Sequence, residues 1–170
     1  MLKHSRIRLI FIAILILLFG LYILGFQISF YWVISITVVF LGITFTGVYL
    51  IRWNYFVNAY NSNHNINDAI ALTFDDGPDE KITPQILDIL DHYNAKATFF
   101  CIGTKLKESK KLAKEIIDRG HEIGNHSYYH ERKFPIVSVK KMVKEINQTN
   151  ELITELTGNE NTLFRPPFGI

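Results

Sequence analysis

The sequence predicts an α/β domain with a parallel sheet, preceded by two transmembrane helices. Two observations support this fold class. Residues 9–51 contain no charged side chain, whereas residues 69–170 alternate short apolar runs with amphipathic stretches. Strand-like and helix-like segments that alternate at this spacing are typical of successive βαβ units, in either a barrel or a doubly wound sheet.

The first 56 residues are predicted to be a membrane anchor. As a single helix, residues 9–51 would be roughly twice as long as the ~30 Å hydrocarbon core is thick, so we expect two spans, at about 9–25 and 28–51. Membrane lipid is therefore an expected partner. A secretory signal peptide is the alternative for the first segment, although its apolar run is long and no small-x-small cleavage site follows.

The sequence leaves open which side of the membrane the following domain occupies. Lys3, Arg6 and Arg8 favour a cytoplasmic N-terminus. Two complete spans would then return the domain to the cytoplasm, whereas one span or a re-entrant second segment would place it outside.

Residues 57–68, rich in Asn with Ser and His, are predicted to be a linker to a domain at residues 69–170. The first 56 residues hold four of the 18 basic residues and none of the 16 acidic ones, so the remainder has a net charge of about −2. No clustered basic face is expected, which excludes nucleic acid as a partner. The single cysteine, Cys101, excludes an intrachain disulfide and is expected to be a small buried side chain.

The predicted strands of the domain are short apolar runs. They are residues 69–74, 97–102, 121–124 and 162–164. The first is almost continuously apolar, which is typical of a parallel strand covered on both faces. It is expected to end at Asp75, because Gly77 and Pro78 predict that the chain leaves the sheet there.

Three amphipathic helices are predicted between these strands. The first should have Thr83 as N-cap and Pro84 as its first residue, the second should cover residues 109–119, and the third should run from a Ser138 cap to Gly158. The expected buried faces comprise Ile86, Leu87, Leu90 and Tyr93 in the first helix and Val139, Met142, Val143, Ile146, Ile153 and Leu156 in the third.

Polar side chains follow three of the predicted strands. Asp75 and Asp76 come after the first strand, His126 and His130 after the third, and Arg165 after the fourth. The carboxyl ends of parallel strands meet at one edge, where catalytic groups of such sheets lie. Two histidines and one carboxylate are a familiar catalytic metal shell, and the second carboxylate suits a general base. A solvated acidic turn and an incidental histidine pair are the alternatives.

The domain resembles the polysaccharide deacetylases, the NodB-homology domain of carbohydrate esterase family four. The similar motifs are TFDDGP at 73–78, HSYYH at 126–130 and RPPFG at 165–169. This resemblance covers about residues 69–170 and implies the N-terminal portion of a distorted (β/α) barrel. The family's domain normally continues through three or four more strand-helix units, so the domain is expected to be truncated at its C-terminus, as in a fragment of a longer protein.

The resemblance also implies roles for the polar residues. Asp76, His126 and His130 would hold a divalent metal, usually zinc. Asp75 would be the general base that takes a proton from the attacking water. Arg165 would pair with Asp75 and keep it charged and oriented.

Further residues are expected to support this site. Asn125 and Ser127 would orient the two histidines. By resemblance, Pro167 would fix the loop that presents a backbone N–H near Phe168 to the oxyanion, and Phe168 would line the sugar groove.

The activity implied by the resemblance is metal-dependent removal of N-acetyl groups from amino sugars of a polysaccharide. Such a substrate in the cell envelope favours an extracytoplasmic domain. Relatives in the family also hydrolyse O-acetyl esters or small cyclic amides. A membrane-tethered glycan-binding or inactive module is the alternative from another class of protein, and the oligomeric state is not predicted.

Overall fold

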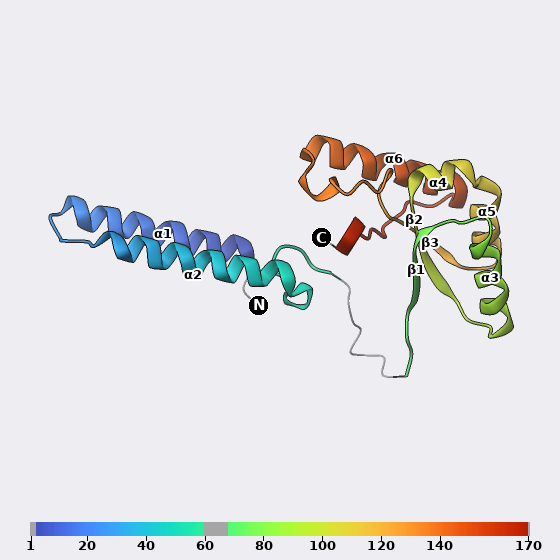
Figure 1. Ribbon diagram of the computed structural model, residues 1–170, viewed down its shortest axis with the longest axis horizontal. Coiled ribbons are helices and arrows are strands. Elements are labelled where there is room, and N and C mark those ends of the chain that lie inside the picture. Colours follow the sequence, from blue (N-terminus) through green and yellow to red (C-terminus); the bar gives the residue numbers. More distant parts are fainter. Residues whose placement is uncertain (1–2, 60–67, 170) are drawn as a thin grey trace. The chain divides into compact units, whose positions relative to one another are not determined.

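The computed structural model describes residues 3–59 and 68–169 (Figure 1). The chain divides into two compact units, Met1–Asn67 and Asp68–Ile170. Most of the predicted linker, residues 60–67, lies outside the described residues.

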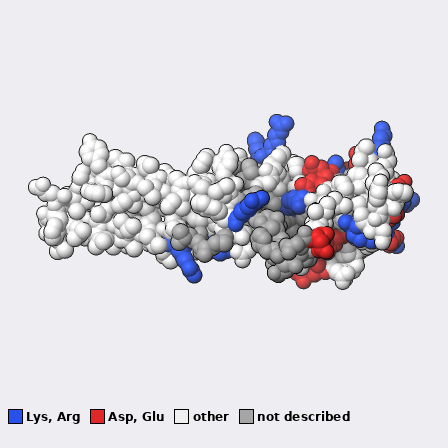
Figure 2. Space-filling model, turned by 90° about the horizontal axis from the view of Figure 1, so that it is seen from below, with Lys and Arg blue, Asp and Glu red and all other residues white. Residues whose placement is uncertain are grey.

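The first unit is a helical hairpin. Helices α1 (His4–Ile23) and α2 (Phe30–Tyr49) lie side by side and are followed by the short η1 (Ile51–Trp53). The 20 residues of each helix would extend ~30 Å, about the thickness of a hydrocarbon core. Length and composition alone thus allow both helices to cross a membrane, and a signal sequence would meet the same criterion. Figure 2 shows uncharged side chains over most of the visible face of this hairpin.

The second unit contains a three-stranded parallel sheet, which confirms the predicted α/β class. Its strands are β1 (Leu72–Gly77), β2 (Ala97–Cys101) and β3 (Glu122–Asn125), in the order β1-β2-β3. The predicted fourth strand is reduced to a single parallel bridge between Asn125 and Phe164.

Helices connect these strands. They are α3 (Ile82–His92), α4 (Gly103–Glu108), α5 (Lys110–Asp118) and α6 (Val139–Thr157), with short 3-10 turns at η2 (Phe134–Ile136) and η3 (Pro167–Gly169). Figure 1 shows α3 and α5 on one side of the sheet. The second and third predicted helices match α5 and α6, and Gly158 ends α6 in the left-handed region at φ 73°. The short α4 was not predicted.

Helices α3 and α5 pack against the sheet through a shared apolar core. Phe99 and Ile123 belong to a core with Leu87 of α3 and Ile116 of α5, all at most 4% exposed. Side chains along β1 alternate between half-buried and exposed, because successive residues of a strand point to opposite faces. The expectation that the first strand is covered on both faces is therefore wrong: among the described residues β1 is an edge strand with one packed face.

The start of α3 also differs from the prediction. The helix begins at Ile82, and the Asp79 carboxylate accepts hydrogen bonds from the N–H groups of Lys81 (2.9 Å) and Ile82 (2.8 Å). These hydrogen bonds lower the pKa of Asp79. Thr83, the predicted N-cap, lies inside the helix and is buried, and its hydroxyl accepts from the Asp79 N–H (2.9 Å). Tyr93, expected in the core, lies beyond the last turn of α3 and is 74% exposed.

The buried face of α6 is more polar than its apolar pattern predicts. Val139 and Val143 are exposed, whereas Glu145 and Thr149 are almost completely buried. The Thr149 hydroxyl donates to the Glu145 carbonyl (3.2 Å), and a Glu145 carboxylate oxygen lies 3.4 Å from the N–H of Tyr129. The helix therefore packs through polar groups against the loop that follows β3.

Cys101 occupies the position that its sequence context predicts. Its side chain is fully buried at the end of β2. Burial raises the pKa of the thiol to about 12, which makes it a packing residue and a poor nucleophile.

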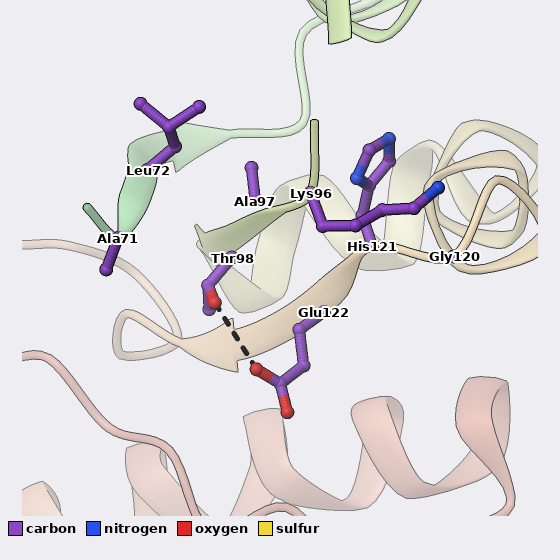
Figure 3. Close-up of a pocket in the computed structure, with 8 residues that line it drawn as sticks. All are labelled: Ala71, Leu72, Lys96, Ala97, Thr98, Gly120, His121 and Glu122. Atoms are coloured by element: carbon purple, nitrogen blue, oxygen red, sulfur yellow. Dashed lines mark hydrogen bonds between the residues drawn. The ribbon is translucent and has the colours of Figure 1, made fainter. Parts of the chain in front are cut away.

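A shallow depression of about 430 Å³ lies where the three strands begin. Its lining residues are Ala71, Leu72, Lys96, Ala97, Thr98, Gly120, His121 and Glu122 (Figure 3). His121 points away from the Thr98–Glu122 hydrogen bond (3.3 Å) and packs edge-on against Phe99. Neither of its ring nitrogens has a hydrogen-bond partner among the described residues, and burial, followed by the nearby Lys96, lowers its pKa.

We expect this neutral imidazole to make the protein less stable in acid. The unfolded chain takes up a proton near the ordinary histidine pKa of about 6.5, and the folded chain takes it up only at lower pH. The stabilisation is therefore fully present above about pH 6.5 and is lost progressively as the pH falls through the lowered folded-state pKa. In His121→Phe, which keeps a ring against Phe99, this part of the pH dependence should disappear. Urea unfolding of the full chain in detergent between about pH 5 and 8 measures it.

The matched control is His92→Gln, because His92 is exposed on α3. This variant should keep the pH dependence of the starting protein. If the unfolding free energy of His121→Phe changes with pH as steeply as that of the starting protein, another group causes the pH dependence.

Candidate metal centre

The two adjacent carboxylates lie at an irregularity near the end of β1. Asp75 pairs with Phe100 and Gly77 with Cys101, so Asp76 is an extra residue without a cross-strand partner. Its φ of 65° is left-handed, and the expected end of the strand at Asp75 is thus replaced by a bulge that continues to Gly77. The bulge explains how two neighbouring side chains of one strand can reach separate partners at the same edge of the sheet.

The three predicted metal ligands come together at this edge. The Oδ1 atom of Asp76 lies 3.1 Å from Nε2 of His130 and 3.4 Å from Nε2 of His126. The three possible ligand atoms lie within 4.8 Å of one another. The His126 side chain is 4% exposed, whereas that of Asp76 is 61% exposed, so a cation would reach the site from the carboxylate side.

Both histidines belong to a loop that follows β3, and not to a helical turn. Ser127 and His130 have positive φ values of 65° and 54°. The Asn125 side-chain oxygen accepts from the Ser127 N–H (2.8 Å), and the Ser127 hydroxyl accepts from the His130 N–H (3.1 Å). Asn125 also donates to the Ile146 carbonyl (2.9 Å) of α6. Asn125 and Ser127 therefore hold the backbone of the loop, and their hydrogen bonds do not involve the imidazole rings.

The partner of the His126 ring is a backbone group that the sequence does not reveal. Nδ1 of His126 lies 2.7 Å from the carbonyl oxygen of Arg165. This hydrogen bond requires a proton on Nδ1 and leaves the Nε2 lone pair free on the side of Asp76. Two imidazole Nε2 atoms and one carboxylate are a suitable donor set for zinc and similar divalent ions, so the residues present fit a metal.

Asp75 forms an ion pair with Arg165. Nη1 of Arg165 donates to Asp75 Oδ1 (2.7 Å) and to the Thr73 hydroxyl (3.0 Å), and the guanidinium lies 4.1 Å from the ring centroid of Phe100. A Cβ atom at Gly124 would lie 2.7 Å from that ring, so glycine leaves the space that the ring fills. Strand alternation could have identified Thr73, which shares a face with Asp75.

The predicted substrate residues follow Arg165 directly. Pro167 is buried, whereas Phe168 is 53% exposed and has a positive φ of 61°. The Phe168 ring lies beside His130, with 4.8 Å between the ring centroids. An aromatic surface therefore borders the three candidate ligands.

Fold and site together define the class of protein. A parallel α/β sheet carries a two-histidine, one-carboxylate cluster beside a carboxylate-guanidinium pair at its carboxyl edge, an arrangement typical of hydrolases. The chain belongs to the polysaccharide deacetylase family, whose model matches residues 62–170.

Similar proteins include two curated deacetylases. Peptidoglycan-N-acetylmuramic acid deacetylase PdaC of Bacillus subtilis is 43% identical over 104 residues, which are 59% of this chain and 21% of that protein. A peptidoglycan-N-acetylglucosamine deacetylase of Bacillus cereus is 42% identical over 112 residues, 65% of this chain and 40% of that protein. The chain thus spans less than half the length of these relatives.

Solved structures of the family have similar folds. That of Bacillus subtilis PdaC is 42% identical, with a TM-score of 0.57 over 59% of this chain and 50% of that one. A CE4 family pseudoenzyme from Bacillus anthracis is 34% identical, with a TM-score of 0.58 over 62% of this chain and 37% of that one. A family 4 acetyl xylan esterase from Clostridium thermocellum is 38% identical, with a TM-score of 0.53 over 59% of this chain and 49% of that one.

Proposed function

We propose that this protein is a metal-dependent hydrolase that removes N-acetyl groups from the amino sugars of a cell-envelope polysaccharide. The observation that supports this best is the convergence of a candidate ligand cluster and a paired carboxylate at one edge of the sheet. The names of the curated relatives, which are peptidoglycan deacetylases, support peptidoglycan as the first substrate to test.

In this proposal the side chains of Asp76, His126 and His130 hold a divalent ion, with zinc as the first candidate. A bound ion of this kind supplies Lewis-acid chemistry, which polarises a carbonyl group and makes water more acidic. In the neutral ring, the hydrogen bond from His126 Nδ1 to the Arg165 carbonyl fixes the tautomer in which Nε2 is the ligand nitrogen.

Asp75 is the proposed general base. It accepts the proton of a water molecule whose oxygen adds to the acetamide carbonyl carbon. The C–N bond then breaks, the proton that Asp75 accepted passes to the nitrogen to give the free amine of the sugar, and the acyl group leaves as acetic acid, which ionises to acetate. Arg165 holds the Asp75 carboxylate in place, and Thr73 and Phe100 in turn hold Arg165.

Phe168 is the proposed contact for the sugar. Its exposed ring beside His130 offers an apolar surface to the ring face of an amino sugar. The buried Pro167 restricts the backbone that precedes it and so helps to place the N–H of Phe168.

The first unit is proposed to be a two-helix membrane anchor. Its helices have the length and composition for this role and expose their apolar side chains. A polysaccharide substrate in the envelope favours an extracytoplasmic site, with membrane lipid around the hairpin. With two complete spans this places the N-terminus outside as well, against the preference of Lys3, Arg6 and Arg8.

Acetate release tests the proposal. The full chain in detergent, supplied with zinc, should release acetate from an N-acetylglucosamine oligomer or from peptidoglycan, and chelation should stop the reaction. Acetate release from acetylated xylan, without release from the amino-sugar substrates, would indicate an esterase like the acetyl xylan esterase among the similar structures.

A second candidate function is a membrane-tethered glycan-binding module without turnover. The similarity to a family member described as a pseudoenzyme supports this alternative. Binding of the oligomer without acetate release would favour it over the hydrolase.

A further inference from the structure

The bulge in β1 leaves Asp76 outside the residue pairing of the described sheet. Asp76 lies between the paired residues Asp75 and Gly77 and has no partner in β2. Its left-handed φ of 65° is a conformation that residues with a Cβ atom adopt at a cost. A contact to this peptide would help to keep the orientation that directs the carboxylate towards the two imidazoles.

Lys105 provides such a contact. Its ammonium group donates a hydrogen bond of 2.7 Å to the carbonyl oxygen of Asp76. The donor comes from α4, the short helix that directly follows β2. A charged donor makes this a stronger hydrogen bond than one between two neutral groups.

The helix that carries Lys105 also contacts the loop of the two histidines. The N–H groups of Gly103 and Thr104 donate to the carbonyls of Ser127 and Tyr128, both at 3.0 Å. The buried Leu106 fixes α4 against the core. One short helix thus contacts both segments that supply the candidate ligands.

The space around Gly103 shows how closely this helix packs. A Cβ atom at Gly103 would lie 2.5 Å from the Thr149 hydroxyl and 2.5 Å from the Tyr128 ring. The amide of Ile102, just before α4, donates to the Gly77 carbonyl (2.9 Å), next to the bulge. These contacts hold the backbone from which the Lys105 side chain reaches the Asp76 carbonyl.

We propose that Lys105 is a positioning residue that holds the Asp76 peptide so that the carboxylate faces His126 and His130. This inference rests on the proposed metal site. The two possible roles of Lys105, as a hydrogen-bond donor and as a positive charge, predict opposite changes in metal affinity. Loss of the hydrogen bond should weaken metal binding, whereas simple loss of a nearby positive charge should strengthen it.

The test is zinc affinity, measured by calorimetric titration of the full chain in detergent. Lys105→Met keeps the apolar stem and removes the donor, and it should bind zinc about 10-fold more weakly or worse, as is typical when a partner of a metal ligand is lost. Lys105→Arg, which keeps charge and donors, should recover most of the affinity. Lys107→Met, an exposed lysine on the same helix, is the matched control for charge and should bind zinc at least as well as the starting protein.

Two further readouts separate positioning from general damage to the fold. The absorption spectrum of bound Co²⁺ reports ligand geometry, and we expect it to change in Lys105→Met and to remain unchanged in Lys107→Met. Cooperative unfolding of the metal-free protein should be retained. If Lys105→Met fails to fold, Lys105→Gln, shorter and uncharged, carries the same expectation.

Equal or tighter zinc binding in the folded Lys105→Met variant, with an unchanged Co²⁺ spectrum, would overturn the inference. Absence of zinc binding in the starting protein would instead contradict the proposed metal site itself. The two failures are therefore distinguishable.

Discussion

Replacing His126 and His130 together by alanine is expected to abolish metal binding. The two imidazoles supply two of the three candidate ligands, and Asp76, with 61% of its side chain exposed, would remain as a single surface carboxylate. One carboxylate does not retain a divalent ion at micromolar concentration. Metal analysis of the full chain after dialysis should find about one ion per chain in the starting protein and almost none in the double variant.

The control for this experiment is His92→Ala, which removes an exposed histidine from α3 and should keep the ion. Acetate release should disappear together with the metal in the double variant. A double variant that still holds one ion per chain would exclude these histidines as ligands. A starting protein without metal but with acetate release would contradict the metal dependence and leave the hydrolase proposal intact.

Asp75→Asn should separate catalysis from metal binding. Asparagine has the shape of aspartate but cannot accept a proton from water, and general base catalysis typically contributes about 10²- to 10⁴-fold in rate. Acetate release should fall by that factor. Zinc binding should persist, because Asp75 contacts Arg165 (2.7 Å) and is not one of the three clustered ligands. Initial rates and zinc titration on the same preparation measure both quantities.

Glu80→Gln is the matched control, since it removes an exposed carboxylate close to the same turn. Its rate of acetate release should equal that of the starting protein. An unchanged rate in Asp75→Asn would exclude Asp75 as the base. Loss of zinc binding in Asp75→Asn would show that the ion depends on Asp75.

The sequence predicts the candidate site better than it predicts the sheet around it. The order of strands and the polar residues at their ends lead to Asp76, His126 and His130, because the carboxyl ends of parallel strands meet at one edge. The structure brings these three side chains together. Their chemical roles remain proposals.

Other features of the site depend on contacts between distant segments, which periodicity does not encode. The bulge at Asp76 is visible only in the pairing of β1 with β2. The support of His126 comes from a backbone carbonyl, which every residue possesses. The short α4 has too few residues for an amphipathic pattern.

The polar face of α6 has a similar explanation. Its sequence contains apolar residues at helical spacing, and Val139 and Val143 nevertheless remain exposed. The buried Glu145 carboxylate accepts from the Tyr129 N–H of the histidine loop, and the buried Thr149 hydroxyl is satisfied within the helix by the Glu145 carbonyl. A hydrophobic pattern identifies apolar surfaces but does not reveal where a helix meets polar backbone.

The hydrogen bonds from Arg165 to Asp75 and from His126 to the Arg165 carbonyl join segments that lie 90 and 39 residues apart in the chain. The unfolded chain cannot hold these groups together, so an ion that binds the cluster would bind the folded state almost exclusively. By mass action such a ligand stabilises the native state in proportion to the logarithm of its free concentration. In the proposed enzyme, metal supply would therefore govern how long the folded protein persists as well as how fast it turns over.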